Sequence, residues 1–183
     1  MFIHKIDENV SLKLIELNDA ERVFELTDGS RAYLKEWLPW LDFTKSVEDT
    51  KNYIHGCLKE MGENKCLHSV ILFNGEIVGI ASFNTINWSN QTAYIGYWLG
   101  ESYQGNGIVT KVAKALTSYA FEHLSLNKVE IRAAVENKKS RSVPERLGYI
   151  KEGSIRQAEW LYDHYVDHVV YGVLASEWRD RLS

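Results

Sequence analysis

The stretch Tyr94-Ile-Gly-Tyr-Trp-Leu-Gly-Glu-Ser-Tyr-Gln-Gly-Asn-Gly-Ile-Val-Thr110 is the most informative part of the chain. A strand-like run passes through a short turn into a helix whose first residues are rich in glycine. Gly105 and Gly107 let the backbone approach a ligand closely. The unpaired N–H groups and the positive dipole end at the helix start suit a phosphate or pyrophosphate. A glycine-rich connection without a ligand is the alternative interpretation.

Two common nucleotide-binding motifs do not fit this turn. A P-loop needs a closing Gly-Lys-Ser/Thr, which the stretch lacks. A dinucleotide fingerprint would put Thr110 where its third glycine belongs. Its turn also follows the strand directly, whereas five residues separate Leu99 from Gly105. Neither motif therefore describes this turn.

The segments on either side predict strands and helices in a mixed order. Asn74-Gly75 predicts a hairpin of residues 68–73 and 76–80, and residues 92–99 extend it into an antiparallel meander. An apolar stripe predicts a helix over 107–123. The other expected elements are a strand at 10–16, a helix opened by Asn18 as N-cap with Glu21 as its capping-box partner, a helix at 47–61, a strand at 128–135, a helix at 138–147 and strands between 149 and 174.

This order argues for a single α+β domain spanning residues 1–183. We expect a twisted, mostly antiparallel sheet flanked by about four helices. Because a helix connects the strands at 92–99 and 128–135, these strands are expected to form one parallel pair.

Composition and charge exclude several classes of protein. A length of 183 residues suits one or two domains, and 45% apolar with 25% charged residues is typical of a folded globular chain. A net charge of -4 offers no general attraction to nucleic acid or to an anionic membrane. The uncharged run 77–100 is interrupted by polar residues, so we do not expect it to span a membrane.

The cysteines and the start of the chain bear on its location. Cys57 and Cys66 are too few for a disulfide framework, which fits a reducing cytoplasm. The first twenty residues carry charges throughout and lack the apolar stretch of a signal peptide. We therefore expect a cytoplasmic protein.

The run Gln104-Gly105-Asn106-Gly107-Ile108-Val109 resembles the signature of the GNAT superfamily of acetyl-CoA-dependent acetyltransferases. That signature reads Gln or Arg, two residues, Gly, one residue, then Gly or Ala. Val109 stands where the last, small residue belongs. The order of elements is also similar to that fold over nearly the whole chain. The resemblance implies acetyl-CoA as co-substrate and no metal.

A second match lies downstream, where Asn137-Lys-Lys-Ser140 and the run Glu145 to Gly153 are similar to the family's Asn-x-x-Ser/Ala and Gly-Phe stretch. Many members use a Tyr seven residues after this Asn as the acid, but Pro144 occupies that place here. Together with the stretch around Tyr94 and with Gln157-Ala-Glu159, these residues resemble the Rim-type (RimJ/RimL) enzymes. Those enzymes acetylate the N-terminal amine of ribosomal proteins.

The resemblance assigns roles to individual residues. Ser140 would be the acid near the coenzyme sulfur, and Glu159 the base that deprotonates the incoming amine. A hydroxyl at a helix start and a solvated strand residue are the alternatives for the two. The coenzyme would contact Trp98, Leu99, Gly100, Gln104, Gly105, Asn106, Gly107, Ile108, Val109, Thr110 and Asn137. The acceptor would meet Trp37, Trp40 and Phe43, although core packing is the favoured role for at least one of these.

Charged clusters elsewhere leave further alternatives. The basic residues Lys138, Lys139, Arg141 and Arg146 lie beside the proposed phosphate turn and suit either the coenzyme phosphates or a solvated helix face. His164 and His168 lie four residues apart in a strand-like run, which separates them by about 13 Å and excludes one shared metal ion.

The sequence thus predicts an acetyl-CoA-dependent N-acetyltransferase that acts on a protein or peptide N-terminus. The alternatives are a small-amine (polyamine or aminoglycoside) acetyltransferase and a non-catalytic module that senses acyl-CoA. No nucleic acid or membrane partner is expected. Pairing of an exposed strand near the C-terminal end is a possible route to a homo-oligomer.

Overall fold

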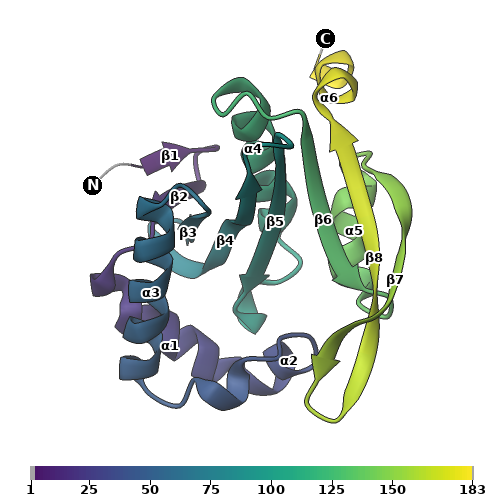
Figure 1. Ribbon diagram of the computed structural model, residues 1–183. Coiled ribbons are helices and arrows are strands. Elements are labelled where there is room, and N and C mark those ends of the chain that lie inside the picture. Colours follow the sequence, from purple (N-terminus) through teal and green to yellow (C-terminus); the bar gives the residue numbers. More distant parts are fainter. Residues whose placement is uncertain (1–2, 183) are drawn as a thin grey trace.

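The computed structural model describes residues 3–182 (Figure 1). The strands are β1 (Ile3–Lys5), β2 (Val10–Leu14), β3 (Leu67–Phe73), β4 (Glu76–Asn87), β5 (Thr92–Leu99), β6 (Lys128–Ala134), β7 (Ile150–Leu161) and β8 (His164–Leu174). The helices are α1 (Ala20–Gly29), α2 (Arg31–Lys35), α3 (Val47–Gly62), α4 (Ile108–Glu122), α5 (Lys138–Arg146) and α6 (Ala175–Leu182).

Within the described residues, all strands belong to one sheet in the order β1-β2-β3-β4-β5-β6-β8-β7. Neighbouring strands are antiparallel except β5 and β6, which are parallel because α4 connects them. The predicted α+β class, the mostly antiparallel sheet and the parallel pair are therefore confirmed. The edge strands are β1 and β7.

Helices cover both faces of the sheet, as the alternating side chains of β3 show. Val70 and Leu72 pack with residues of α1 and α3, whereas Ile71 between them belongs to the cluster that contains α4. Successive side chains of a strand point to opposite faces, so these clusters lie on opposite sides. Strands covered on both faces explain the long apolar runs in the sequence.

The predicted hairpin turn is also confirmed. Asn74 and Gly75 have φ values of 52° and 85°, the left-handed conformation that a tight two-residue turn requires. Strand β4 is longer than predicted and ends at Asn87, because a bulge near Asn84 lets it stay paired with β5.

The predicted N-cap at Asn18 is wrong. A single 3₁₀ turn, Leu17–Asp19, precedes α1, and the capping box joins Glu16 to Asp19. Asp19 accepts the backbone N–H of Glu16 at 2.9 Å and also pairs with the buried ammonium of Lys13 at 2.5 Å. A buried charge needs such a partner, so Asp19 rather than Asn18 is fixed at the residue before α1.

Candidate active site

The site begins where β5 and β6 separate. Within the described residues, the parallel pairing joins Thr92–Ile95 to Lys128–Ile131. Beyond it the two strands are no longer paired with each other, and β5 stays paired with β4 while β6 stays paired with β8. Figure 1 shows the two strands diverging toward their carboxyl ends. Ligands of α/β sheets bind in crevices of this kind, outside the carboxyl ends of parallel strands. Two cavities occupy the crevice.

The first, the coenzyme cavity, has a volume of about 460 Å³ and lies at the start of α4. Gly105 and Gly107 have φ values of 80° and 69°, which L residues rarely adopt, so glycine is needed to form this turn. A Cβ atom at either position would meet no described atom within 4 Å, so the space beside the turn is open. The first N–H groups of α4 have no partner within the helix. The turn therefore fits a pyrophosphate.

Most of the predicted coenzyme residues line this cavity. They are Trp98, Leu99, Gln104, Gly105, Asn106, Gly107, Ile108, Val109, Thr110 and Asn137. Gly100 does not line it. Its N–H donates to the carbonyl of Val78 at 2.9 Å, and its carbonyl accepts the N–H of Tyr103 at 3.1 Å. The backbone groups of Gly100 are thus engaged within the fold, and its contact with the coenzyme stays a prediction.

The four basic residues at 138–146 do not all have the same surroundings. Lys139 and Arg146 line the coenzyme cavity. Arg141 instead donates to the hydroxyl of Tyr171 at 3.0 Å and to the carbonyl of Val135 at 2.7 Å, so it ties α5 to the sheet. Two cations beside an open turn with free N–H groups suit the phosphates of coenzyme A.

The second, the acceptor cavity, has a volume of about 610 Å³ and crosses the sheet face from β3 to β7. Trp37, Trp40 and Phe43 all line it. Both tryptophans are half-buried, and Phe43 is 80% exposed, so none of the three belongs to the core. Trp40 packs on Trp98 with ring centroids 6.0 Å apart. The cavity wall is therefore largely aromatic.

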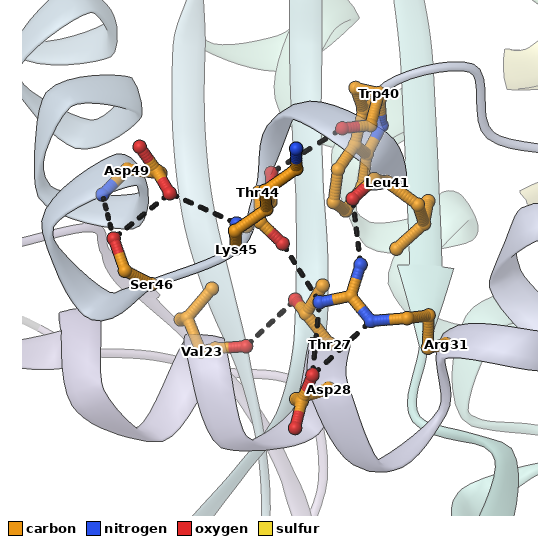
Figure 2. Close-up of polar contacts among 10 residues, drawn as sticks. All are labelled: Val23, Thr27, Asp28, Arg31, Trp40, Leu41, Thr44, Lys45, Ser46 and Asp49. Atoms are coloured by element: carbon orange, nitrogen blue, oxygen red, sulfur yellow. Dashed lines mark hydrogen bonds and ion pairs between the residues drawn. The ribbon is translucent and has the colours of Figure 1, made fainter.

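The loop that carries these aromatic residues is held from two sides. Figure 2 shows Arg31 donating to the carbonyls of Leu41, at 2.7 Å, and Thr44, at 2.8 Å, while Asp28 accepts from the same guanidinium. On the other side, the hydroxyl of Tyr162 in the β7–β8 turn donates to the carbonyl of Leu38. Arg31 supplies several donors in a fixed planar fork, which suits this task.

Ser140 lies where the two cavities meet, and it lines both of them. The side chain of Asn137 accepts the N–H of Ser140 at 3.1 Å and so caps α5. The hydroxyl of Tyr97 donates to the carbonyl of Ser140 at 3.0 Å, and the Ser140 hydroxyl lies 3.4 Å from the same phenol oxygen. Burial raises the pKa of Tyr97, so the phenol stays protonated and neutral.

Glu159 lies on β7 and lines the acceptor cavity. Its Oε2 atom is 3.4 Å from Nε2 of His168, and its side chain is 31% exposed. A bulge precedes it: β7 pairs through Ile155 with His168 and resumes through Glu159 with Val166. The carboxylate is therefore set at the cavity wall and is not a freely solvated strand residue.

Val109 and Pro144, the two residues that depart from the family pattern, have different surroundings. Val109 lines the coenzyme cavity and also packs against the core, so it contributes to the fold from the helix start. Pro144 lies inside α5 and is buried, and it lines neither cavity. Pro144 itself therefore offers no hydroxyl to the reacting groups, and the hydroxyls at the junction of the two cavities are those of Ser140 and Tyr97.

Sequence reasoning missed three residues of this site: Tyr97, Arg31 and His168. Tyr97 and His168 line the acceptor cavity, but only the folded sheet brings them beside Ser140 and Glu159. From the sequence, His168 is considered only as a metal ligand, and that role is excluded. Among the residues that the structure describes, no group of three metal-ligating side chains gathers. In residues 3–182, no helix is long and apolar enough to cross a membrane.

Comparison with known proteins identifies the family. The Acetyltransferase (GNAT) domain matches residues 9–150. The chain belongs to the GNAT acetyltransferases. A putative ribosomal N-acetyltransferase of Bacillus subtilis, YdaF, is 35% identical over 179 residues, covering 97% of this chain and 98% of that protein. A ribosomal-protein-serine acetyltransferase of Escherichia coli is 35% identical over 169 residues, covering 91% and 93%.

Solved structures agree with this assignment. A RimL ribosomal L7/L12 alpha-N-protein acetyltransferase in complex with coenzyme A superposes with a TM-score of 0.91 at 28% identity, covering 94% of this chain and 98% of that chain. The microcin C7 self-immunity acetyltransferase MccE, in complex with acetyl-CoA and AMP, has a TM-score of 0.88 at 30% identity, covering 93% and 94%. The protein is therefore a GNAT N-acetyltransferase with acetyl-CoA as co-substrate.

Proposed function

We propose that this enzyme acetylates the N-terminal α-amine of a protein, with a ribosomal protein as the acceptor. The observation that carries the proposal is the junction of the two cavities at Trp98, Tyr97 and Ser140. An acceptor reaches the thioester there through a broad aromatic cavity. The relatives support this acceptor, because those of Bacillus subtilis and Escherichia coli described above are named for ribosomal substrates.

The charge of the acceptor cavity favours a peptide over a polyamine. Among the described residues that line it, the carboxylates are those of Asp49 and Glu159, and Arg132 adds a positive charge. Asp49 is engaged with the hydroxyl of Ser46 and the N–H of Lys45, both at 2.9 Å. A polyamine with several ammonium groups needs a more acidic wall. A peptide N-terminus brings a single charge to Glu159.

The chemistry also favours an α-amine. The reaction is direct attack of a neutral amine on the thioester, and an α-amine with a pKa of about 7.7 to 8.0 is substantially neutral near pH 7.4. A lysine side chain, with a pKa of about 10.4, is neutral only about one time in a thousand. An α-amine therefore needs less help from the site.

We assign Ser140 as the acid and Glu159 as the group that assists deprotonation of the amine. Ser140 is the hydroxyl at the junction, and a buried neutral phenol next to it fixes its position. Glu159 faces the same cavity from β7, which suits proton transfer directly or through one water. The coenzyme phosphates would bind the Gln104–Thr110 turn with Lys139 and Arg146.

A panel of amines tests the proposed acceptor. Release of free coenzyme A is measured with peptides that have a free N-terminus, with spermidine and with an aminoglycoside. We expect the largest kcat/KM for the peptides. A preference for spermidine or the aminoglycoside would replace the protein acceptor by a small amine.

A further inference from the structure

Glu159 and His168 form a pair of titratable side chains at the acceptor cavity. Oε2 of Glu159 lies 3.4 Å from Nε2 of His168, and the two side chains are 31% and 16% exposed. Both line the cavity that Ser140 also lines. A carboxylate this close to one nitrogen of an imidazole favours the proton on that nitrogen, which leaves the other nitrogen to accept a proton.

A bulge in β7 creates this contact. Three residues of β7, 156–158, stand opposite the single residue Asp167 of β8. The N–H of Gln157 donates to Oδ1 of Asp167 at 2.7 Å, and Gln157 has a φ of 48°. In a regular ladder continued from the pair Ile155–His168, Glu159 would lie opposite His164, two positions nearer the start of β8 than Val166 and about 7 Å farther from His168. The bulge therefore draws Glu159 back to His168.

We propose that His168 is a further catalytic residue, whose imidazole accepts the proton that the incoming ammonium releases while Glu159 holds the ring and balances its charge. The proposal rests on the proposed function for one point, namely that the reacting amine lies beside Glu159. The carboxylate beside Nε2 favours the proton on that nitrogen. Nδ1 is then the nitrogen that accepts, directly or through one water.

The protons of the reaction balance with this assignment. The ammonium gives one proton to His168 and becomes a neutral amine. Its nitrogen then bonds to the thioester carbonyl carbon, and the C–S bond breaks. The departing thiolate takes the proton of the Ser140 hydroxyl, which in turn receives the second proton of the amine nitrogen. The imidazolium of His168 returns its proton to solvent.

The match of acidities favours an imidazole over a carboxylate as the resting place of the proton. In water a histidine side chain titrates near pH 6.5 and a glutamate near 4.3, against about 7.7 to 8.0 for an α-amine. Transfer to the imidazole is thus uphill by about one unit, and transfer to the carboxylate by more than three. A general base works best when its acidity lies close to the working pH.

The other charged and titratable groups around His168 have their own partners. On β6, Arg132 faces the same cavity and pairs with Glu130 at 2.9 Å. On β5, the ring of Tyr94 lies under that guanidinium, and its centroid is 5.5 Å from Cζ of Arg132. On β8 itself, Asp167 is bound to the bulge. The carboxylate of Glu159 is therefore the group that sets the charge at the imidazole.

The tautomer of His168 can be measured without any substrate. In ¹⁵N-histidine NMR of the free protein, we expect the neutral ring of His168 to carry its proton on Nε2. A proton on Nδ1 of the neutral ring would overturn the proposal.

Kinetics test the catalytic role. His168→Gln keeps a donor for Glu159 but cannot accept a proton, so kcat/KM should fall by about a hundredfold at pH 7 and recover most of this loss near pH 9.5, where the amine is neutral. Because the pair acts as a unit, adding Glu159→Gln should cost little more. A uniform loss at every pH, or none, would contradict the role.

The matched control is His164→Gln. His164 also contacts a carboxylate, Asp163 at 2.6 Å, but this pair is exposed and lines neither cavity. We expect its pH profile to match that of the wild type. The kinetics use the amine of the panel with the highest kcat/KM. With another acceptor, the pH at which activity recovers follows the pKa of that amine, and the loss at pH 7 still tests His168.

Discussion

The hydroxyl of Tyr97 and the main chain of Ser140 are joined across the crevice, with the phenol donating to the Ser140 carbonyl at 3.0 Å. The Ser140 hydroxyl also lies 3.4 Å from the phenol oxygen. This contact links β5 to α5, the elements on either side of the two cavities. It fixes the position of a hydroxyl where the coenzyme sulfur and the amine would meet.

Ser140→Ala is therefore expected to affect turnover more than binding. With acetyl-CoA and a peptide acceptor, kcat should fall by about ten- to a thousandfold while the affinity for acetyl-CoA changes little, since the role proposed for the hydroxyl is to protonate the leaving thiolate. Steady-state kinetics with a direct binding measurement separates the two. A loss of affinity with kcat unchanged would make Ser140 a binding residue.

Gly107→Val is expected to abolish acetyl-CoA binding or to raise its KM strongly. A β-branched residue is strained at a φ of 69°, and its side chain would enter the space beside the turn. Gly107→Asn is the control for strain, because Asn tolerates this conformation but still adds a side chain. Both variants should bind acetyl-CoA more weakly in calorimetry. Wild-type affinity in both would remove the site from the start of α4.

Arg31→Lys is expected to loosen the aromatic loop. The guanidinium of Arg31 bridges two carbonyls of that loop and a carboxylate on α1, and lysine cannot make these contacts together (Figure 2). The side chain is 32% exposed, so we expect a loss of about 1 kcal/mol, seen as a roughly fivefold higher KM for the acceptor. The KM for acetyl-CoA is the internal control. An equal rise in both constants would indicate general destabilisation.

Much of the fold follows from local sequence patterns. The Asn-Gly turn, the apolar stripe of α4 and the glycine-rich start of that helix depend on residues close together in the chain, and all of them appear in the structure. The N-cap of α1 could not be predicted in this way. It depends on Asp19 pairing with the buried Lys13, six residues earlier in the chain, a side-chain contact that helix-capping patterns do not include.

In the site, too, the features that lie within short motifs could be predicted, and those that depend on other contacts could not. The coenzyme turn and Ser140 lie in short motifs, so their places in the cavities could be anticipated. Gly100 does not line the coenzyme cavity, and a neighbouring strand uses its N–H. The partner Tyr97 was missed because it lies 43 residues from Ser140 in the chain, and His168 was missed because its contact with Glu159 depends on the bulge in β7. Nothing in the local pattern of His168 predicts a bulge opposite it.

Glu159→Gln is expected to show a loss that depends on pH. The amide keeps the shape of the side chain and removes its charge, so activity should fall near neutrality and recover partly at pH 9, where an α-amine is mostly neutral without assistance. A pH profile of kcat/KM checks this. Wild-type rates from pH 6 to 9 would make Glu159 structural, and an equal loss throughout would indicate that its charge only attracts the ammonium.

The central claim is that the acceptor is an N-terminal α-amine, and a matched pair of peptides tests it most directly. One peptide carries a free N-terminus and no lysine. The other has the same sequence with a blocked N-terminus and one lysine. After incubation with acetyl-CoA, fragment masses locate the added acetyl group. The account predicts acetylation of the first peptide at its α-nitrogen and none of the second. Acetylation of the lysine, with the free N-terminus left unmodified, would contradict it.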